Sequence, residues 1–426
     1  MKVINQPEKK EWSAILKRPY VDNAAVMKSV QHIIDAVRTR GDAALVEFSK
    51  KFDGVEIASL QVCAAEIEAS NASVAHDLKV AIQHAKKNIE TFHAAQRSNV
   101  KKIETAPGIT CWQKSVPIEK VGLYIPGGTA PLFSTVLMLA VPAQLAGCPE
   151  IILCTPPNKE GVIHPAILYT AHLCGIKKIY KAGGAQAIGA MAFGTESIPA
   201  VYKIFGPGNQ YVTAAKQAVQ LQGVAIDMPA GPSEVCVLAD DSAVPRFVAA
   251  DLLSQAEHGR DSQVLLVSTS QDVVRNVLHE IEGQLSLLPR KEIAAQALEN
   301  SNAIIMASME EAVALVNEYA AEHLILACAG AEGIAEKIIA AGSVFIGNYA
   351  PESAGDYASG TNHTLPTNAF ARAYSGVSLD SFYKKMTFQK LTKEGLQTIA
   401  QTVITMAEAE GLDAHAKAVA VRLSAE

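Results

Sequence analysis

Cysteine is scarce in this chain, and neither sign of charge predominates. The 426 residues include seven cysteines with no CxxC pair among them, so neither a disulfide framework nor a thiolate zinc site fits the sequence. The formal charge of -6, from 37 basic and 43 acidic residues, provides no basic footprint for nucleic acid or for an anionic membrane. We therefore expect the partner to be a small molecule.

Long apolar runs are also missing. The amino terminus continues into proline and charged residues, and the longest apolar run, 130–147, contains Pro142 and Gln144. This pattern fits neither a signal-peptide core nor a membrane span. We expect a cytoplasmic protein without a membrane partner.

The chain has enough length and apolar content for more than one lobe. At 426 residues, of which 49% are hydrophobic, it exceeds what a single core usually serves. Apolar residues at helical spacing over 22–51 and 68–97 predict an amino-terminal helical section. From residue 121 onward, short β-rich runs alternate with helix-like segments, which is typical of βαβ units around a parallel sheet.

This alternation forms two series. The first predicts strands at 121–125, 150–155, 176–181 and 201–205, with helices near 132–146, 164–174, 184–193 and 210–221. The second predicts strands at 235–239, 263–268, 303–307 and 343–346, with helices at 244–258, 271–286, 291–299, 310–321 and 331–341. Beyond residue 378 the pattern predicts helix again.

We expect an α/β fold of two doubly wound, incomplete Rossmann-like lobes, with a helical amino-terminal section and a helical carboxy-terminal tail. Residues 1–120 would form the helical section and 121–234 the lobe with dinucleotide-binding turns. Residues 235–377 would form the lobe with metal and catalytic residues, and 378–426 the tail. Because the tail is short for a domain, it must dock on its own lobe or on a partner subunit.

A polar stretch at 351–363 has the composition of a site. It places Glu352, Asp356 and His363 among glycines and serines, with almost no bulky aliphatic side chain. Small residues let the backbone approach a ligand closely. We therefore expect this stretch to form one wall of a binding site.

Two further segments pair groups that can do chemistry. Gln255 and His258 are three residues apart, on the last predicted turn of a helix that Gly259 can end, so they would share one face. A cap on that helix end is an equally good interpretation of His258. Glu322 and His323 are adjacent; because neighbouring side chains diverge, they would serve two reacting groups, such as a water-activating carboxylate and a general base. An exposed helix end is the alternative.

Loops before and after the predicted strands suit ligand binding. The turn at 227–234 holds Ser233 before a buried strand, and a connector or a ligand loop would both explain it. Glycine-rich turns at 123–131, 183–190 and 205–209 each lie between a strand and a helix, where backbone N–H groups can hold phosphate. None spells GxGxxG, and an acidic residue for a ribose is not obvious, so composition supports a nucleotide site only weakly.

Nitrogen and oxygen donors in distant parts of the chain suit a divalent metal such as Zn²⁺, although no HExxH motif is present. They are Gln255, His258, Asp356 and His415. Sequence spacing does not by itself assemble them.

Seven of these segments, in this order, resemble the histidinol dehydrogenase family, and the resemblance runs from the amino-terminal helices to the last helix. The segments are ValGlyLeuTyrIleProGlyGly, GlyGlyAlaGlnAlaIle, IlePheGlyProGlyAsn, AspMetProAlaGlyProSerGluVal, LeuLeuSerGlnAlaGluHisGly, GluHisLeuIle and ProGluSerAlaGlyAspTyrAlaSerGlyThrAsnHis. The resemblance implies NAD-dependent oxidation of L-histidinol to L-histidine, the last step of histidine biosynthesis. Two hydride transfers to two NAD⁺ would pass through a bound L-histidinaldehyde.

The resemblance also implies a role for each matching residue. His323 would be the general base and Glu322 would activate water. One Zn²⁺ per subunit, held by Gln255, His258, Asp356 and His415, would position the substrate, whose imidazole and amine complete the coordination. Together with these ligands and His323, Ser233 and Glu410 would contact the substrate. The dinucleotide contacts would be Tyr124, Gln186 and Asn209.

The family is homodimeric, and the carboxy-terminal segment of one subunit reaches the active site of the other. This property implies that Glu410 and His415 act in trans here. It would also explain the short tail.

Two other functions compete with this interpretation. A cysteine-dependent aldehyde dehydrogenase would use a thiol nucleophile, and Cys148 and Cys154 lie closest to the nucleotide-like turns. Their sequence settings are those of a turn and of the end of a buried strand, where a thiol usually serves as a small hydrophobe. A non-catalytic metal or small-molecule binding protein is the other competitor, but it leaves Glu322 and His323 without a task.

Overall fold

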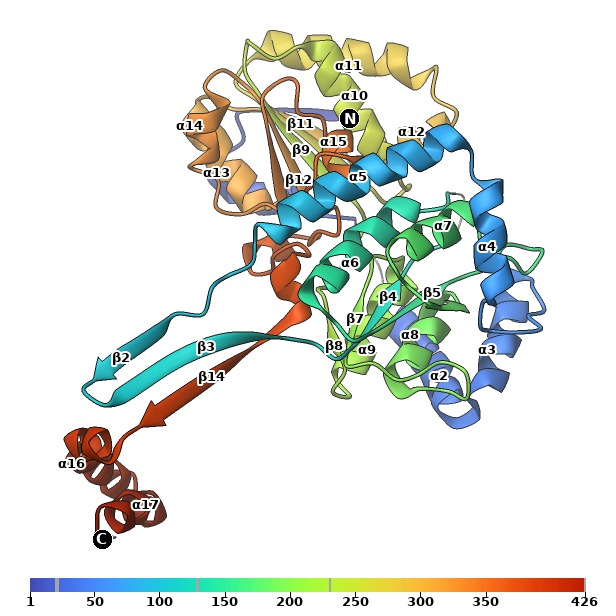
Figure 1. The fold of residues 1–426 in the computed structure, drawn as a ribbon. Coiled ribbons are helices and arrows are strands. Elements are labelled where there is room, and N and C mark those ends of the chain that lie inside the picture. The colour runs from blue at the N-terminus through green and yellow to red at the C-terminus, as the bar shows by residue number, and fades with distance from the viewer. Residues whose placement is uncertain (20–22, 128–129, 230, 425–426) are drawn as a thin grey trace.

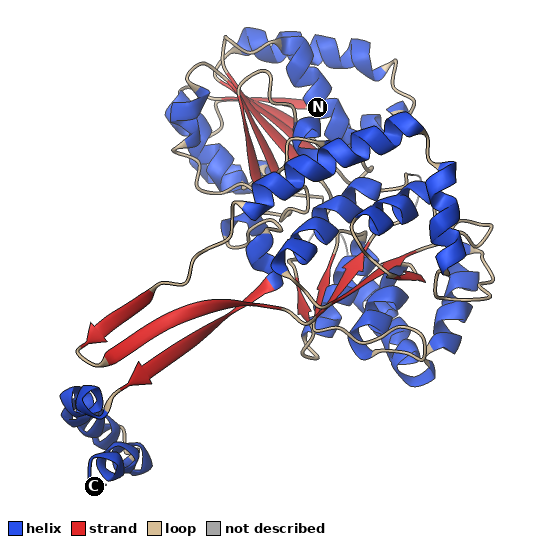
Figure 2. Ribbon diagram, in the orientation of Figure 1, coloured by secondary structure: helices blue, strands red, loops and turns tan. Residues whose placement is uncertain are grey.

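The computed structural model describes residues 1–19, 23–127, 130–229 and 231–424. Over these ranges the chain forms two parallel sheets covered by helices, a long antiparallel arm and a pair of terminal helices (Figures 1 and 2). The predicted α/β class is confirmed. None of the described helices is both long and apolar enough to cross a membrane.

The first lobe is built on a five-stranded parallel sheet with the order β6-β5-β4-β7-β8. Its strands are β4 (Lys120–Tyr124), β5 (Glu150–Thr155), β6 (Lys178–Lys181), β7 (Lys203–Phe205) and β8 (Ala225–Ile226). Both faces of the sheet are buried, as parallel sheets require, and the chain reverses direction across the sheet at β4.

Helices from two parts of the chain cover this sheet. The crossover helices are α6 (Phe133–Ala146), α7 (Pro165–Leu173), α8 (Gly184–Phe193) and α9 (Gln210–Gln220). The amino-terminal section adds α2 (Asn23–Arg40), α3 (Asp42–Phe48), the π-helical turn η2 (Ser49–Asp53), α4 (Ala64–Ser73) and α5 (His76–Ala94). Helix α2 packs on α8 and α9, whereas α5 packs on α6, so each face has its own hydrophobic core.

The second lobe is built on a six-stranded parallel sheet with the order β1-β11-β10-β9-β12-β13. Its strands are β1 (Lys2–Asn5), β9 (Glu234–Ala239), β10 (Gln263–Ser268), β11 (Asn302–Ile305), β12 (His323–Ala327) and β13 (Ser343–Ile346). The helices around it are α1 (Trp12–Ile15), α10 (Pro245–Ala256), α11 (Gln271–Leu285), α12 (Lys291–Glu299), α13 (Met309–Tyr319), α14 (Ala331–Ala335) and α15 (Glu352–Tyr357).

A three-stranded antiparallel arm leaves the first lobe and ends in two helices, the tail helices (Figure 1). The arm has the order β14-β3-β2, with β2 (Lys102–Ala106), β3 (Ile109–Pro117) and β14 (Tyr383–Leu391). The tail helices are α16 (Lys393–Ala409) and α17 (Asp413–Ser424). Short 3-10 turns complete the elements: η1 (Lys9–Glu11), η3 (Phe370–Arg372) and η4 (Leu379–Phe382).

Six strands depart from the sequence-based prediction: β1, β2, β3 and β14, together with β8 and β12, for which no strand was predicted. Residues 1–120 are not helical throughout, because they contain β1, β2 and β3, and the helix predicted from residue 378 is wrong over Tyr383–Leu391. Strands β1 and β14 pair with segments far away in the sequence, as Lys2 does with Asn302 and Phe388 with Trp112. Local periodicity contains no information on such partners.

The root of the arm is embedded in the core of the first lobe. Phe382 is fully buried and stacks on Phe205 with ring centroids 4.0 Å apart. Its carbonyl accepts a hydrogen bond from the backbone N–H of Ile118 at 3.0 Å, and Lys203 Nζ donates to the carbonyl of Ser381 at 2.8 Å. Packing and hydrogen bonds together fix the direction in which the arm leaves the lobe.

We expect Phe382→Ala to destabilise the first lobe by about 3–5 kcal/mol, because it removes a fully buried ring from a close-packed stack. Urea-induced unfolding followed by circular dichroism measures the change as a lower midpoint. The matched control is Phe92→Ala, which truncates an exposed ring and should shift stability by no more than about 0.5 kcal/mol. Equal midpoints for the two variants would contradict this account of the arm root.

Candidate active site

Two cavities share Asn209 in their walls: the first lies within the first lobe, and the second lies between the lobes. The first, about 860 Å³, is lined by Tyr124 and Gln186 of the first lobe. The second, about 770 Å³, is lined by Ser233 and His258 of the second lobe. Asn209 lines both cavities, so a ligand in one can contact the same side chain as a ligand in the other.

The first cavity lies at the carboxyl ends of the strands, where ligands bind in open α/β sheets. Tyr124 ends β4, Gln186 lies in the first turn of α8, and Asn209 is the N-cap of α9, accepting from the backbone N–H of Val212 at 3.2 Å. The Tyr124 hydroxyl accepts from the backbone N–H of Gly184 at 3.0 Å. The glycine-rich turn at 123–131 contributes Gly127, but its residues 128–129 lie outside the described part of the chain.

The turn at 205–209 requires glycine. Gly206 has a φ of +135°, and a Cβ there would lie 2.1 Å from the carbonyl oxygen of Tyr124. Any larger residue would therefore push Tyr124 away from the cavity. The backbone N–H of Gly206 donates to Asp227 at 2.8 Å, which connects this turn to the loop before β9.

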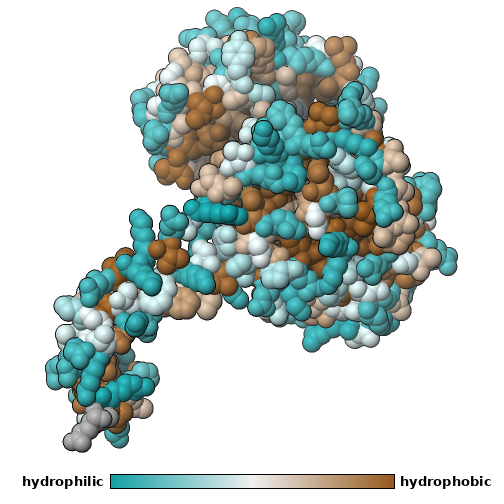
Figure 3. Space-filling model, in the orientation of Figure 1, coloured by the Kyte–Doolittle hydropathy of each residue, from teal (hydrophilic) through white to brown (hydrophobic). Residues whose placement is uncertain are grey.

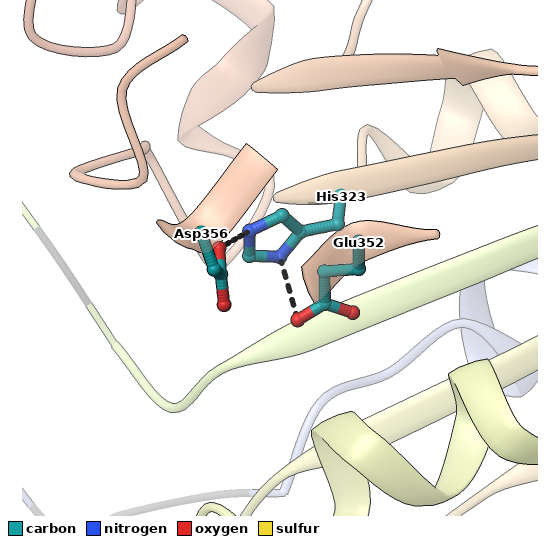
Figure 4. Close-up of side chains that lie close together, drawn as sticks. All are labelled: His323, Glu352 and Asp356. Atoms are coloured by element: carbon teal, nitrogen blue, oxygen red, sulfur yellow. Dashed lines mark ion pairs between the residues drawn. The ribbon is translucent and has the colours of Figure 1, made fainter. Parts of the chain in front are cut away.

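In the second lobe the site lies at the opposite edge, where the strands begin. His323 is the first residue of β12, and Glu352 and Asp356 lie one turn apart on α15 (Figure 4). His323 Nε2 is 3.6 Å from Asp356 Oδ1, and its Nδ1 is 3.8 Å from Glu352 Oε1. One ligand atom from each of the three residues lies within 4.8 Å of the others, which is close enough to hold a cation.

The backbone fixes the orientation of the His323 ring. Its Nδ1 lies 3.1 Å from the carbonyl oxygen of Glu234, which can only accept, so Nδ1 carries a proton. Its Nε2 is buried and has no hydrogen-bond partner among the described residues. A neutral His323 therefore presents an unprotonated Nε2 beside Asp356.

The cluster has strongly perturbed acid–base properties. Burial alone would lower the pKa of His323, but the charges of Glu352, Glu322 and Asp356 outweigh it and raise that pKa to about 10. Burial raises the pKa of Glu322 and of Glu352 to about 8 each. For Asp356, burial is outweighed by the nearby positive charge of a protonated His323, which lowers its pKa. A shared negative charge thus surrounds one imidazole.

Glu322 and His323 converge rather than diverge, contrary to the sequence-based expectation. Glu322 Oε2 lies 3.7 Å from His323 Nδ1 and accepts from the backbone N–H of Glu234 at 2.9 Å. Glu322 precedes the first residue of β12, so the alternation of side chains along a strand does not apply to it. Both residues are buried, so the interpretation as an exposed helix end is wrong.

Gln255 and His258 reach the same region from α10. Gln255 is fully buried; oriented to satisfy its neighbours, its amide donates to the Glu352 carboxylate and accepts from the backbone N–H of Glu234 at 2.9 Å. Helix α10 ends at Ala256, so His258 lies beyond it and not on its last turn as predicted. His258 lines the second cavity, where loss of hydration lowers its pKa although the nearby charge of Asp356 opposes this shift.

His363, the third polar residue of the 351–363 stretch, joins the two lobes. Its Nδ1 hydrogen-bonds the carbonyl of Asp356 at 2.9 Å, and its Nε2 lies 3.0 Å from Thr135 Oγ1 on α6. This pairing orients the backbone of Asp356 from the first lobe.

Glu410 and His415 lie apart from the cluster within one chain. Glu410 directly follows α16 and His415 lies on α17, and both are exposed at the far end of the arm (Figure 1). Apolar side chains are exposed along the arm and tail helices as well, as the brown patches in Figure 3 show. They include Ile103, Met386, Met406 and Val421.

Sequence reasoning missed two residues that the structure brings to the site. Asp53 ends η2 and lines the first cavity, and its Oδ2 is buried without a hydrogen-bond partner among the described residues. Arg18 lines the second cavity and forms an ion pair with Glu234. No spacing rule could have found them. Asp53 lies in the amino-terminal section, far in sequence from the glycine-rich turns, and Arg18 is 216 residues from its partner Glu234.

Comparisons with known proteins agree on one family. A sequence model of the histidinol dehydrogenases matches residues 16–423. The chain is 60% identical to the histidinol dehydrogenase of Bacteroides thetaiotaomicron over 424 residues, 100% of this chain and 99% of the relative. It is 52% identical to that of Salmonella typhimurium over 415 residues, 97% of this chain and 95% of the relative. The crystal structure of the histidinol dehydrogenase from Elizabethkingia anophelis is 57% identical, with a TM-score of 0.97, and covers 99% of this chain and 98% of that one.

The burial of Cys148 and Cys154 gives a prediction about thiol reactivity. Both are buried, and loss of hydration raises the pKa of Cys148 to about 11 and that of Cys154 further. At neutral pH we expect both to react with a chromogenic disulfide at least about a hundredfold more slowly than the exposed Cys63. Urea-unfolded protein, in which all seven thiols are accessible, is the control. Rapid labelling of Cys148 or Cys154 in the folded protein would revive a thiol nucleophile.

Proposed function

The chain belongs to the histidinol dehydrogenase family, and from that premise we propose how its own residues divide the reaction. Its activity is the oxidation of histidinol in histidine biosynthesis. We assign NAD to the first cavity and L-histidinol to the second. The observation that carries the assignment is the pair Glu322 and His323, buried side by side at the start of β12, with His323 Nε2 left without a partner among the described residues.

His323 is the general base in this proposal. With its Nδ1 proton donated to the carbonyl of Glu234, Nε2 accepts the hydroxyl proton of L-histidinol while the hydride of the same carbon passes to NAD⁺. The product of this step is L-histidinaldehyde. Placing a proton acceptor within hydrogen-bond reach of a reacting hydroxyl contributes about 10²–10⁴-fold to the rate.

Glu322 prepares the second oxidation. Its carboxylate takes a proton from the water that adds to the aldehyde, while His323 returns the proton gained in the first oxidation to the aldehyde oxygen, which completes the hydrate. His323, again unprotonated at Nε2, then accepts a hydroxyl proton of the hydrate as a second hydride passes to a second NAD⁺, leaving the carboxyl group of L-histidine, which releases its proton to solvent. Burial supports this role of Glu322, because it raises the pKa of this carboxyl to about 8 and so makes its anion a stronger base.

The donors present fit a zinc ion. They are nitrogen and oxygen atoms around a buried negative charge, and Asp356 belongs both to the cation-sized triad with His323 and Glu352 and to the ligand set of the family. We propose that Gln255, His258 and Asp356 hold Zn²⁺, with His415 supplied by the partner subunit. When bound, the ion would orient the imidazole and amine of the substrate.

The first cavity suits a dinucleotide. Tyr124, Gln186 and Asn209 line it, and the amino-terminal ends of α8 and α9 point backbone N–H groups toward an anion such as a pyrophosphate. Asp53 offers the acidic group that the sequence did not reveal, and its unpartnered Oδ2 suits the hydroxyls of a ribose. Because Asn209 lines both cavities, we place the nicotinamide end beside it.

We propose a homodimer in which the tail helices complete the partner's site. Two observations support it: Glu410 and His415 are distant from the cluster of their own chain, and the arm and tail helices expose apolar side chains such as Met406. A closed two-fold dimer with exchanged arms would cover these side chains and bring both residues to a site.

Neither competing function suits the structure. A thiol nucleophile would have to come from Cys148 or Cys154, which are buried with raised pKa values. A non-catalytic binding protein is inconsistent with membership in a dehydrogenase family.

The exchanged tail predicts complementation between two inactive variants. His415→Ala lacks a metal ligand, and His323→Ala lacks the base. In a mixed dimer, one site combines the intact His323 of one chain with the intact His415 of the other, so it should work. Random mixing should restore about a quarter of the unmodified activity, since half of the dimers are mixed and each has one working site. Absence of restored activity would count against a shared site; each variant alone is the control.

Glu322→Gln should separate the two oxidations. The variant keeps the size of the side chain but cannot take a proton from water, so oxidation of L-histidinaldehyde should fall by about 10²–10⁴-fold. Oxidation of L-histidinol to the aldehyde should fall much less. NADH formation in single turnovers from each substrate measures both steps. A variant that keeps its aldehyde activity would show that water is activated by another group.

Glu352→Gln should move the pH profile. Against the lowering effect of burial, Glu352 is the largest contributor to the raised pKa of His323, so removing its charge lowers that pKa and leaves the base deprotonated at lower pH. The acidic limb of the kcat profile should therefore shift to lower pH by about one unit. Glu311→Gln, on the exposed face of α13, should leave the profile in place. A shift to higher pH would show that Glu352 is not an anion beside His323.

A further inference from the structure

Glu234 holds both proposed catalytic side chains with its main chain. It is the first residue of β9, between β10 and β12 in the sheet. Its backbone N–H donates to Glu322 Oε2 at 2.9 Å, and its carbonyl lies 3.1 Å from His323 Nδ1. One peptide segment therefore sets the position of the water-activating carboxylate and the tautomer of the base.

The side chain of Glu234 is also held by several contacts. It is buried, and its two oxygens accept from Arg18 Nε and Nη2 at 2.8 Å each. Oε1 also accepts from the backbone N–H of Asn368 at 2.9 Å. A bidentate pair between guanidinium and carboxylate fixes direction as well as distance, and it is among the strongest side-chain contacts.

Arg18 is itself held by Tyr319. Its Nη2 donates to the carbonyl of Tyr319 at 2.7 Å, and its guanidinium lies 4.1 Å from the centroid of the Tyr319 ring. The Tyr319 hydroxyl donates to Gln263 Oε1 at 3.0 Å, on the first residue of the neighbouring strand β10. The carbonyl and the ring of Tyr319 thus hold the guanidinium in place, and the guanidinium in turn restricts the side chain of Glu234.

We propose that Glu234 is a positioning residue for Glu322 and His323, and that Arg18 is its anchor. The inference rests on the proposed roles of those two residues. Loss of the Arg18 contact lets the Glu234 side chain rotate, which tilts the peptide groups that meet Glu322 and His323. Displacements of about 1 Å at reacting groups lower rates on the order of a hundredfold. Arg18 also lines the second cavity, so direct substrate binding by Arg18 is the competing role.

The test uses Glu234→Gln in the full-length, zinc-loaded enzyme. This change preserves the shape of the side chain but removes the charge that Arg18 pairs with. We expect kcat to fall at least tenfold for L-histidinol and for L-histidinaldehyde, with KM for either substrate within about twofold of the unmodified value. Zinc content per subunit should stay unchanged, because Glu234 is not among the proposed ligands.

Glu66→Gln is the matched control. Glu66 Oε1 pairs with Lys181 Nζ at 2.6 Å in the first lobe, where the Lys181 side chain is buried and that of Glu66 is half-buried. This variant removes an ion pair of the same kind without touching the site, so its kcat should stay unchanged even if its stability falls. Arg18→Lys provides a second test in case Glu234→Gln folds poorly. It keeps the positive charge but cannot donate two parallel hydrogen bonds to the carboxylate, so kcat should fall by an intermediate amount with KM unchanged.

Three results would overturn the positioning role. One is a kcat of Glu234→Gln equal to that of Glu66→Gln, which would reduce the Arg18 pair to a structural ion pair. Another is a raised KM with unchanged kcat in Arg18→Lys, which would make Arg18 a substrate contact. The third is an unmodified enzyme that forms no NADH from L-histidinol, and this result alone would also overturn the proposed function.

Discussion

Three carboxylates surround one imidazole at the start of β12, and the buried charge of this cluster governs the rest of the site. Burial, reinforced by the neighbouring carboxylates, raises the pKa of Glu322 and of Glu352 to about 8. At His323 the charges of these carboxylates outweigh burial and raise the pKa to about 10. A divalent cation beside Asp356 would neutralise part of this charge, lower the pKa of His323 and return it to the range of a base at neutral pH. The cluster is therefore suited to receive a cation before it can act as a base.

The two lobes approach this cluster from opposite edges of their sheets. The first lobe presents the carboxyl ends of its strands, where Tyr124 and the amino-terminal end of α9 lie. The second lobe presents the beginnings of β9 and β12, which carry Glu234 and His323. A cofactor held by the first edge and a substrate held by the second would meet near Asn209, which lines both cavities. Hydride transfer needs this meeting, and neither lobe could provide it alone.

Much of the fold was predictable because the signals are local. The βαβ alternation marks most strands of both sheets, and the motifs around Gln255, His323 and Asp356 each lie within a few residues. Strands β1 and β14 were not predictable, since their partners are remote in the sequence. The same limit hid the Arg18–Glu234 pair and Asp53. The convergence of Glu322 and His323 was also missed, because it depends on β12 beginning at His323.

The central claim is that a metal-dependent, NAD-dependent oxidation of L-histidinol takes place between the two lobes. Formation of NADH from L-histidinol by the purified chain, with and without a chelator, tests it most directly. The account predicts two NADH for each L-histidinol consumed, loss of this activity on removal of the metal, and its return when Zn²⁺ is added. Absence of NADH from zinc-loaded protein, or full activity in the metal-free protein, would contradict it.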